Sequence, residues 1–235
     1  ISIDGVDSNA GSNEFPLRTF EEARKRMRGG TVKKVLIKPG EYKLLKPIIL
    51  DHRDNGQHWV GQIVDGSLPV LDGQFKVTDG FLVLGGSHIR IENIHIKDTI
   101  FRGVGVHGGS AFSDDATMNI SVGPARQNII SNIEVSNILA PKIGDYSYWN
   151  SGGVVAEGNT PGIIVSNNYF HDMNSMGLRI AAEGRAGDDI SESIISNNLI
   201  VRTMGKIEDG GSIYVQDVYG KSTGIKISEN AIFVY

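Results

Sequence analysis

The chain has 235 residues, including 30 glycines and no cysteine, and its formal net charge at pH 7 is −4. The absence of cysteine excludes disulfides, zinc–thiolate sites and cysteine nucleophiles. An acidic chain without clustered Lys and Arg does not attract nucleic acid or an anionic membrane surface, and no run of about 18 apolar residues predicts a membrane span. Neither nucleic acid nor a membrane is therefore expected as a partner.

Residues 1–50 predict an N-terminal cap and the first coil of a larger fold. Ile1 to Asp4 has the pattern of a short strand, and Thr19 can cap a helix over residues 20–28 that stops at Gly29-Gly30. An amphipathic helix in this place would cover the open end of a core. Short apolar strands are then expected at residues 35–37, 39–42 and 48–50.

A degenerate repeat dominates residues 51–235. The segment 165–170, Val-Ser-Asn-Asn-Tyr-Phe, returns at 195–200 and 227–232, with weaker copies at 91–96 and 130–135. Short β-branched alternations broken by Gly, Asn and Asp at irregular spacing are typical of β-solenoid coils and not of helical repeats. The sequence predicts an all-β fold, a right-handed parallel β-helix with an N-terminal capping helix, in which residues 1–235 form a single domain.

The Asn that recurs in the repeat predicts a turn between two strands of each coil. Asn tolerates the left-handed backbone conformation, and its amide can bond to the Asn of the next coil. These Asn residues are expected to be structural, and they set the register of every coil.

That register aligns the strands 103–107, 153–157, 177–181 and 212–216 without gaps. Because side chains alternate along a strand, the positions predicted to face the core are Val104, Val106, Val154, Ala156, Leu178, Ile180, Ile213 and Val215. The outward columns are Gly105, Val155, Arg179 and Tyr214, then His107, Glu157, Ala181 and Gln216, and the preceding turn carries Asn150, Asn174 and Asp209. One outer face is thus predicted to collect polar and charged side chains.

Several segments carry a resemblance to a known group of proteins. Residues 7–11, 16–23, 38–42 and 69–73 resemble the N-terminal module of secreted right-handed parallel β-helix proteins that act on polysaccharides, namely pectate-lyase-like enzymes and β-helix glycoside hydrolases. Residues 167–172 and 208–214 are similar to segments of the β-helix glycoside hydrolases. The resemblance covers most of the chain and implies carbohydrate chemistry, without implying which bond is broken.

The first hypothesis is a glycoside hydrolase that acts on an extracellular or cell-wall polysaccharide. Asp209, together with its neighbour Glu208, and Glu157 would supply the acid and base, because two coils separate them by about 10 Å, near the upper end of the roughly 6.5–9.5 Å of inverting glycosidases. Substrate-binding residues would be Arg179, Tyr214, Gln216, His107, Tyr148 and Trp149.

Each of these residues also has a structural interpretation. Asp209 can be a turn residue that bonds its own backbone, and Glu157 can be a charge at a strand end. Arg179 needs a partner such as Glu157 or Asp209, so a structural ion pair is the alternative to binding a substrate carboxylate. Tyr214 can cover the sheet instead of stacking on a sugar, and His171-Asp172 is expected to cap a turn.

Two other functions remain open. A polysaccharide lyase would use Arg179, Tyr214 and His107 to bind a uronic acid and remove its C5 proton. A non-catalytic β-helix, such as a phage tail-fibre segment or an adhesin, would lack a cleft and could form a trimer. No metal site is predicted; if a cation binds, Ca²⁺ at Asp114-Asp115 or Asp188-Asp189 is the candidate.

The two ends of the sequence carry expectations as well. The chain begins inside a predicted strand, which indicates a mature or trimmed form of an extracellular, periplasmic or virion-associated protein. It stops inside a repeat without a polar cap, so we expect it to be truncated there. Further coils, another chain or a second copy in a homo-oligomer would then cover the C-terminal end.

Overall fold

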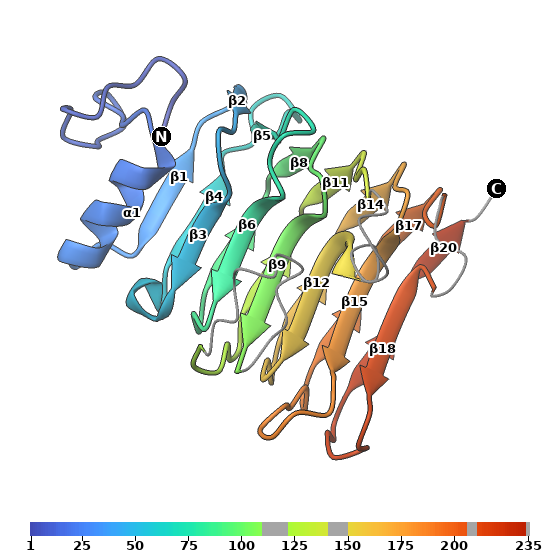
Figure 1. The fold of residues 1–235 in the computed structure, drawn as a ribbon. Coiled ribbons are helices and arrows are strands. Elements are labelled where there is room, and N and C mark those ends of the chain that lie inside the picture. Colours follow the sequence, from blue (N-terminus) through green and yellow to red (C-terminus); the bar gives the residue numbers. More distant parts are fainter. Residues whose placement is uncertain (110–121, 141–149, 206–210, 234–235) are drawn as a thin grey trace.

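The computed structural model describes residues 1–109, 122–140, 150–205 and 211–233. Each coil contributes strands that stack on the equivalent strands of the next coil. The stacking gives three parallel sheets that run along the length of the solenoid (Figure 1). Connected parallel strands of this kind form right-handed crossovers. The chain folds as the right-handed parallel β-helix that its repeat predicts.

The strands are named by sheet. Sheet A contains β1 (Lys34–Ile37), β4 (His58–Gly61), β7 (Arg90–Glu92), β10 (Ile129–Ser131), β13 (Ile164–Ser166), β16 (Ile194–Ser196) and β19 (Lys226–Ser228). Sheet B contains β2 (Glu41–Lys43), β5 (Val70–Asp72), β8 (His95–Lys97), β11 (Glu134–Ser136), β14 (Tyr169–His171), β17 (Leu199–Val201) and β20 (Ala231–Phe233). Sheet C contains β3 (Ile48–Asp51), β6 (Asp79–Leu84), β9 (Arg102–Gly108), β12 (Gly152–Gly158), β15 (Met176–Ala182) and β18 (Ile213–Asp217).

The core is a stack of apolar side chains that point inward from all three sheets. Ile195 of sheet A, Phe170 of sheet B and Leu178 of sheet C are each fully buried. All eight side chains predicted to face inward from sheet C belong to this core or pack against it. The alternation read from the sequence is therefore confirmed, and it places the polar positions of sheet C on the outer surface of the solenoid.

The asparagine turns join sheet A to sheet B. The residues at positions 93, 132, 167, 197 and 229 all have φ between 53° and 58°, the left-handed conformation predicted for them. The amide of Asn197 donates to Asn167 Oδ1 at 2.5 Å, so the predicted contact between coils forms. A second ladder lies one residue further on and is buried: Asn168 donates to Asn198, and Asn198 to Asn230, each at 2.9 Å.

Helix α1 (Phe20–Gly29) covers the N-terminal end of the core, as predicted. Thr19 accepts a hydrogen bond from the backbone of Glu22, which caps the helix. Phe20 packs between two rings of the first coils, with centroids 5.5 Å from Tyr42 and 6.2 Å from Trp59. The core is thereby closed at this end.

The strand predicted for Ile1 to Asp4 is wrong. The chain makes isolated contacts there, from the Ile1 amine to the Leu36 carbonyl at 2.7 Å and from the Ser2 amide to the Leu17 carbonyl at 2.9 Å. A turn at residues 3–4 follows at once, so no ladder can extend. Ile1 is nevertheless buried and belongs to the core.

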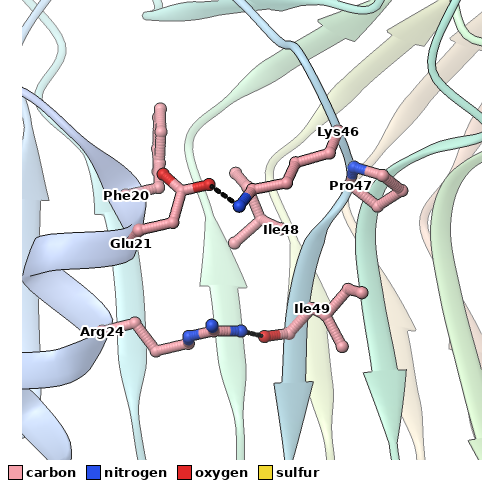
Figure 2. Close-up of a pocket in the computed structure, with 7 residues that line it drawn as sticks. All are labelled: Phe20, Glu21, Arg24, Lys46, Pro47, Ile48 and Ile49. Atoms are coloured by element: carbon pink, nitrogen blue, oxygen red, sulfur yellow. Dashed lines mark hydrogen bonds and ion pairs between the residues drawn. The ribbon is translucent and has the colours of Figure 1, made fainter.

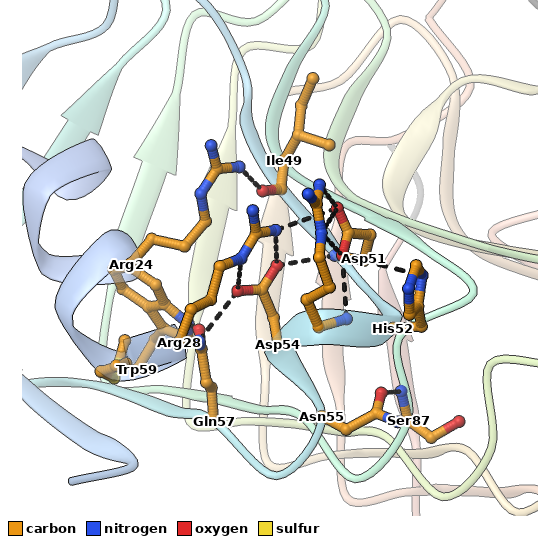
Figure 3. A network of polar contacts seen from close by, with 12 residues as sticks. Arg24, Arg28, Ile49, Asp51, His52, Asp54, Asn55, Gln57, Trp59 and Ser87 are labelled. Atoms are coloured by element: carbon orange, nitrogen blue, oxygen red, sulfur yellow. Dashed lines mark hydrogen bonds and ion pairs between the residues drawn. The ribbon is translucent and has the colours of Figure 1, made fainter. Parts of the chain in front are cut away.

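A polar network fastens α1 to the second coil (Figure 3). Asp54, at the end of the short 3₁₀ helix η1 (His52–Asp54), is fully buried and accepts from Arg28 Nε at 2.6 Å and from Gln57 Nε2 at 2.9 Å. Gln57 in turn accepts from the indole of Trp59 at 3.1 Å. Every buried polar group of the network has a hydrogen-bond partner, and the network was not predicted from the sequence.

Within the described ranges no helix has the length and apolar content to cross a bilayer.

Candidate functional site

The outer face of sheet C brings together most of the predicted site residues that the structure describes. Glu157 pairs in register with His107 on β9, and Arg179 pairs with Tyr214 on β18. Gln216 lies opposite Ala181, as the alignment required. The register predicted from the repeat is therefore confirmed across β9, β12, β15 and β18.

Glu157 is a buried carboxylate although it lies on the outer face of the solenoid. Its side chain is 3% exposed, Arg179 donates to it, and His107 Nδ1 lies 3.4 Å from Oε2. Among the described residues His107 Nδ1 has no hydrogen-bond partner, so its contact with Glu157 is electrostatic. Burial alone raises the pKa of Glu157, but the approach of His107 and the charge of Arg179 outweigh it and lower the pKa below its usual range.

Arg179 joins two carboxylates. Its Nη1 donates to Glu157 and its Nη2 donates to Glu183, the residue that follows β15. Its guanidinium also lies over the ring of Tyr214, 5.8 Å from the centroid. The ion pair predicted between Arg179 and Glu157 is thus present, and the guanidinium is engaged by protein groups on two sides.

Glu183 is the carboxylate of this cluster that reaches solvent. Its side chain is 31% exposed, whereas that of Arg179 is 6% exposed. The turn after it is fixed by Asp188, whose Oδ2 accepts from the backbone of Glu183 and of Arg185, each at 3.0 Å. Glu183 was not among the predicted site residues, although the alternation of Arg179 and Ala181 predicts an outward side chain at position 183.

A second buried ion pair lies on the same face, nearer the N-terminal end. Arg102 donates to Asp79, and both side chains are almost fully buried. A Cβ on Gly105 would lie 3.1 Å from Arg102 Nε and 3.1 Å from Asp79 Oδ1. Glycine at this outward position therefore leaves room for the pair, which was also missed.

Several predicted residues lie outside the described part of the chain. These are Asp209, Glu208, Tyr148, Trp149 and the pair Asp114-Asp115. Their roles remain predictions.

Asp188 and Asp189, the other residues predicted as candidates to bind a cation, accept hydrogen bonds from backbone amides. Asp188 caps the turn after β15, and Asp189 Oδ1 accepts from the Ser191 amide at 2.8 Å. Among the described residues, no group of three or more His, Asp or Glu side chains is arranged to hold a metal ion.

Sheet B carries a separate polar cluster on its outer face. His171 lies between two carboxylates, with Nε2 3.0 Å from Glu134 and Nδ1 2.6 Å from Asp172, and its ring stacks on Tyr169 at 4.2 Å. Arg202 donates to both oxygens of Asp172, to Oδ1 at 2.5 Å and to Oδ2 at 2.8 Å. His171 thus links neighbouring coils in addition to its contact with the turn residue Asp172.

A shallow pocket lies between α1 and β3 (Figure 2). It is lined by Phe20, Glu21, Arg24, Lys46, Pro47, Ile48 and Ile49. Lys46 pairs with Glu21 at 3.2 Å across it, and Arg24 donates to the Ile49 carbonyl. The pocket lies at the opposite end of sheet C from β18, away from the cluster around Arg179.

No protein-family model matches the chain, and no curated protein sequence matches it. Among solved structures it is similar to pectate lyase Pel9A, at 13% identity over 100% of this chain and 76% of that one, with a TM-score of 0.38. It is similar to an alginate lyase from Paenibacillus sp. str. FPU-7, at 10% identity over 92% and 95% of the two chains, with a TM-score of 0.35. It is also similar to the A-module of the mannuronan C-5 epimerase AlgE4 of Azotobacter vinelandii, at 11% identity over 91% and 89%, with a TM-score of 0.24. The assignment of the fold rests on the strand pairing.

Proposed function

We propose that the chain is an enzyme that acts on an extracellular polysaccharide, with the glycan bound on the outer face of sheet C near β15 and β18. The observation that carries the proposal is the cluster in which Arg179 joins Glu157 and Glu183. Burying charges costs several kcal/mol per ion unless they are paired. Clusters of buried, coupled ionisable groups of this kind are typical of functional sites. The sequence resemblance to β-helix proteins acting on polysaccharides supports the same conclusion.

Glycoside hydrolysis is the reaction that this set of carboxylates favours. One carboxylic acid must protonate the glycosidic oxygen, and one carboxylate must activate water or attack the sugar. Glu183 is held as a partner of Arg179 and reaches solvent, so it is the proposed carboxylate. Asp209, predicted from the sequence as one member of the acid–base pair, remains a prediction. Glu157, almost inaccessible and with a lowered pKa, is better suited to position Arg179 than to donate a proton.

A polysaccharide lyase is the second candidate, and one observation favours it. Tyr214 lies beside the cation Arg179 on the same face, and a tyrosine can serve as the base that removes the C5 proton of a uronic acid. Against it, the guanidinium of Arg179 is engaged by Glu157 and Glu183, so another cation would have to neutralise the substrate carboxylate.

A product-resolved screen over neutral and uronic-acid glycans tests the proposal. New reducing ends without ultraviolet absorbance from unsaturated sugars would support hydrolysis, and that absorbance would support a lyase. Glu183→Gln should lower kcat by at least about a hundredfold, within the range that acid–base groups contribute. Glu14→Gln, a change at an exposed carboxylate in the N-terminal loop, is the matched control. Absence of product from every glycan would overturn the proposed function.

A further inference from the structure

The turn that follows β18 is held rigid by one carboxylate. Asp217 accepts hydrogen bonds from the backbone amides of Ser222 at 2.6 Å, Gly220 at 3.0 Å and Tyr219 at 3.2 Å. These bonds, that of Ser222 foremost, lower the pKa of Asp217. A turn built in this way presents its side chains in one arrangement and loses little entropy when a ligand binds.

The side chain that this turn presents is an aromatic ring. Tyr219 is 63% exposed, and the neighbouring Val218 is 51% exposed. The ring edge lies against the backbone of Gly184, where an added Cβ would come within 3.0 Å of Tyr219 Cε2. Gly184 directly follows Glu183, so the exposed ring lies beside the residue proposed as the reacting carboxylate.

A positively charged side chain lies against the ring. The Lys221 ammonium lies over one face of the Tyr219 ring, 5.3 Å from its centroid, so a sugar would stack on the other face. Within the described part of the chain, no carboxylate lies within ion-pair distance, 4.0 Å, of this ammonium. The turn therefore presents an exposed aromatic ring and a positive charge together. It follows β18, the strand that pairs with the Arg179 strand β15 (Figure 1).

We propose that Tyr219 and Lys221 form a binding subsite for a sugar that carries a carboxylate, that is, a uronic acid residue of the polysaccharide. The apolar face of a pyranose ring stacks on an aromatic face, and an ammonium forms a charge-assisted bond with a carboxylate. The inference rests on the proposed function, because the subsite would hold one residue of the same chain of sugars. It assigns the substrate to the acidic polysaccharides.

Isothermal titration calorimetry with defined oligosaccharides tests the subsite without requiring turnover. The probes are tetragalacturonate and tetramannuronate as acidic glycans and cellotetraose as a neutral one. We expect an acidic probe to bind more tightly than cellotetraose. Tyr219→Ala should weaken that binding at least about fivefold, and Tyr219→Phe, which keeps the ring, should not. Lys221→Gln should weaken binding of the acidic probe and remove most of its salt dependence.

Lys226→Gln, which removes an exposed lysine of the same end of the solenoid, is the matched control and should bind as the wild type does. Far-ultraviolet circular dichroism and thermal unfolding establish that each variant is folded. If the acidic probes bind through Tyr219 and Lys221 but no glycan is turned over, the subsite stands and the proposed enzyme fails. If turnover occurs while both variants bind the probes as the wild type does, or if no acidic probe binds, the subsite is overturned.

Discussion

Glu157 and Arg179 form an ion pair on the outer face of a parallel β-helix, yet their side chains are only 3% and 6% exposed. They come from neighbouring strands, β12 and β15. Arg179 pairs in register with Val155, so Glu157 lies two residues further along β12, on the diagonal. Polar residues on the outer face of a solenoid are ordinarily solvated, whereas a buried charge that loses its partner is strongly destabilising. The pair therefore makes the fold sensitive to the loss of one member.

Arg179→Met is expected to lower the free energy of unfolding by about 3–5 kcal/mol, because it leaves Glu157 buried without its partner. Urea unfolding at neutral pH measures the change. The double variant Glu157→Met/Arg179→Met should recover much of the loss, since neither charge then remains. A double variant as unstable as the single one would show that the pair contributes through packing and not through charge.

The buried asparagine ladder gives a second test. Asn198 Oδ1 accepts from the backbone and the amide of Asn168, at 3.1 and 2.9 Å, and its own amide donates to Asn230 at 2.9 Å. Asn198→Ala leaves these buried groups without hydrogen-bond partners. It should lower the free energy of unfolding by about 2–4 kcal/mol, more than one ordinary hydrogen bond contributes. The measurement is chemical denaturation.

The neighbouring Asn197 is the control for the ladder. It is exposed and has φ of 54°, a conformation that glycine adopts without strain. Asn197→Gly should therefore change the unfolding free energy by less than about 1 kcal/mol. Equal losses in the two variants would contradict the separation of the turn residue from the ladder residue.

The repeat allowed much of sheet C to be predicted, because an alternation of two residues and a fixed turn determine which side chains face outward. This is why the contact between Glu157 and Arg179 followed from the alignment. Their burial did not follow, since alternation says which face a side chain is on and not what covers that face. Glu183 carried the same signal of alternation but lies just past the aligned segment.

Other parts of the fold lacked a repeating signal. Strand β4 was not predicted because its segment His58 to Gly61 is not followed by the asparagine turn that marks the later coils. The role of Asp54 could not be predicted from the sequence. Its partners Arg28 and Gln57 come from a helix and a loop that only the folded chain brings together. Such contacts depend on tertiary structure and not on a local pattern.

The network around Asp54 leads to a third prediction. Asp54→Ala removes the acceptor of Arg28 and of Gln57, and it leaves the Gln57 amide buried without a partner. Because Arg28 keeps a contact with Asp51 at 2.9 Å, we expect a loss of about 1–3 kcal/mol in unfolding free energy, measured by urea unfolding. Asp51→Asn, at a partly exposed position, should cost less; the reverse order would place the main anchor of α1 at Asp51.

His171 makes the stability depend on pH. The hydrogen bond to Glu134, foremost, and that to Asp172 raise its pKa. A raised folded-state pKa means that the contribution of His171 is fully present below the unfolded value of about 6.5 and is lost as the pH rises through the folded value. The difference in unfolding free energy between wild type and His171→Gln should thus be larger at pH 5.5 than at pH 8.5.

The neighbouring groups fix the sign of this prediction. Glu134 and Asp172 have lowered pKa values and so remain carboxylates at pH 5.5, where His171 is charged. His95 lies on the other side of Glu134, and burial foremost lowers its pKa, so its own contribution has the opposite dependence on pH. Burial, the largest cause of the His95 shift, is common to wild type and His171→Gln and cancels in the difference, whereas the lesser effect of the His171 charge on His95 does not.

A direct titration separates the proposed cause from a general effect of pH. The ring protons of His171, followed by NMR, should titrate above the usual histidine range in the wild type, because a protonated ring is stabilised between two carboxylates. Glu134→Gln removes the larger of the two causes and should lower the pKa of His171 measured in the same way. A pKa unchanged by Glu134→Gln, or a stability difference that grows as the pH rises, would contradict the assignment of His171 as a charged link between neighbouring coils.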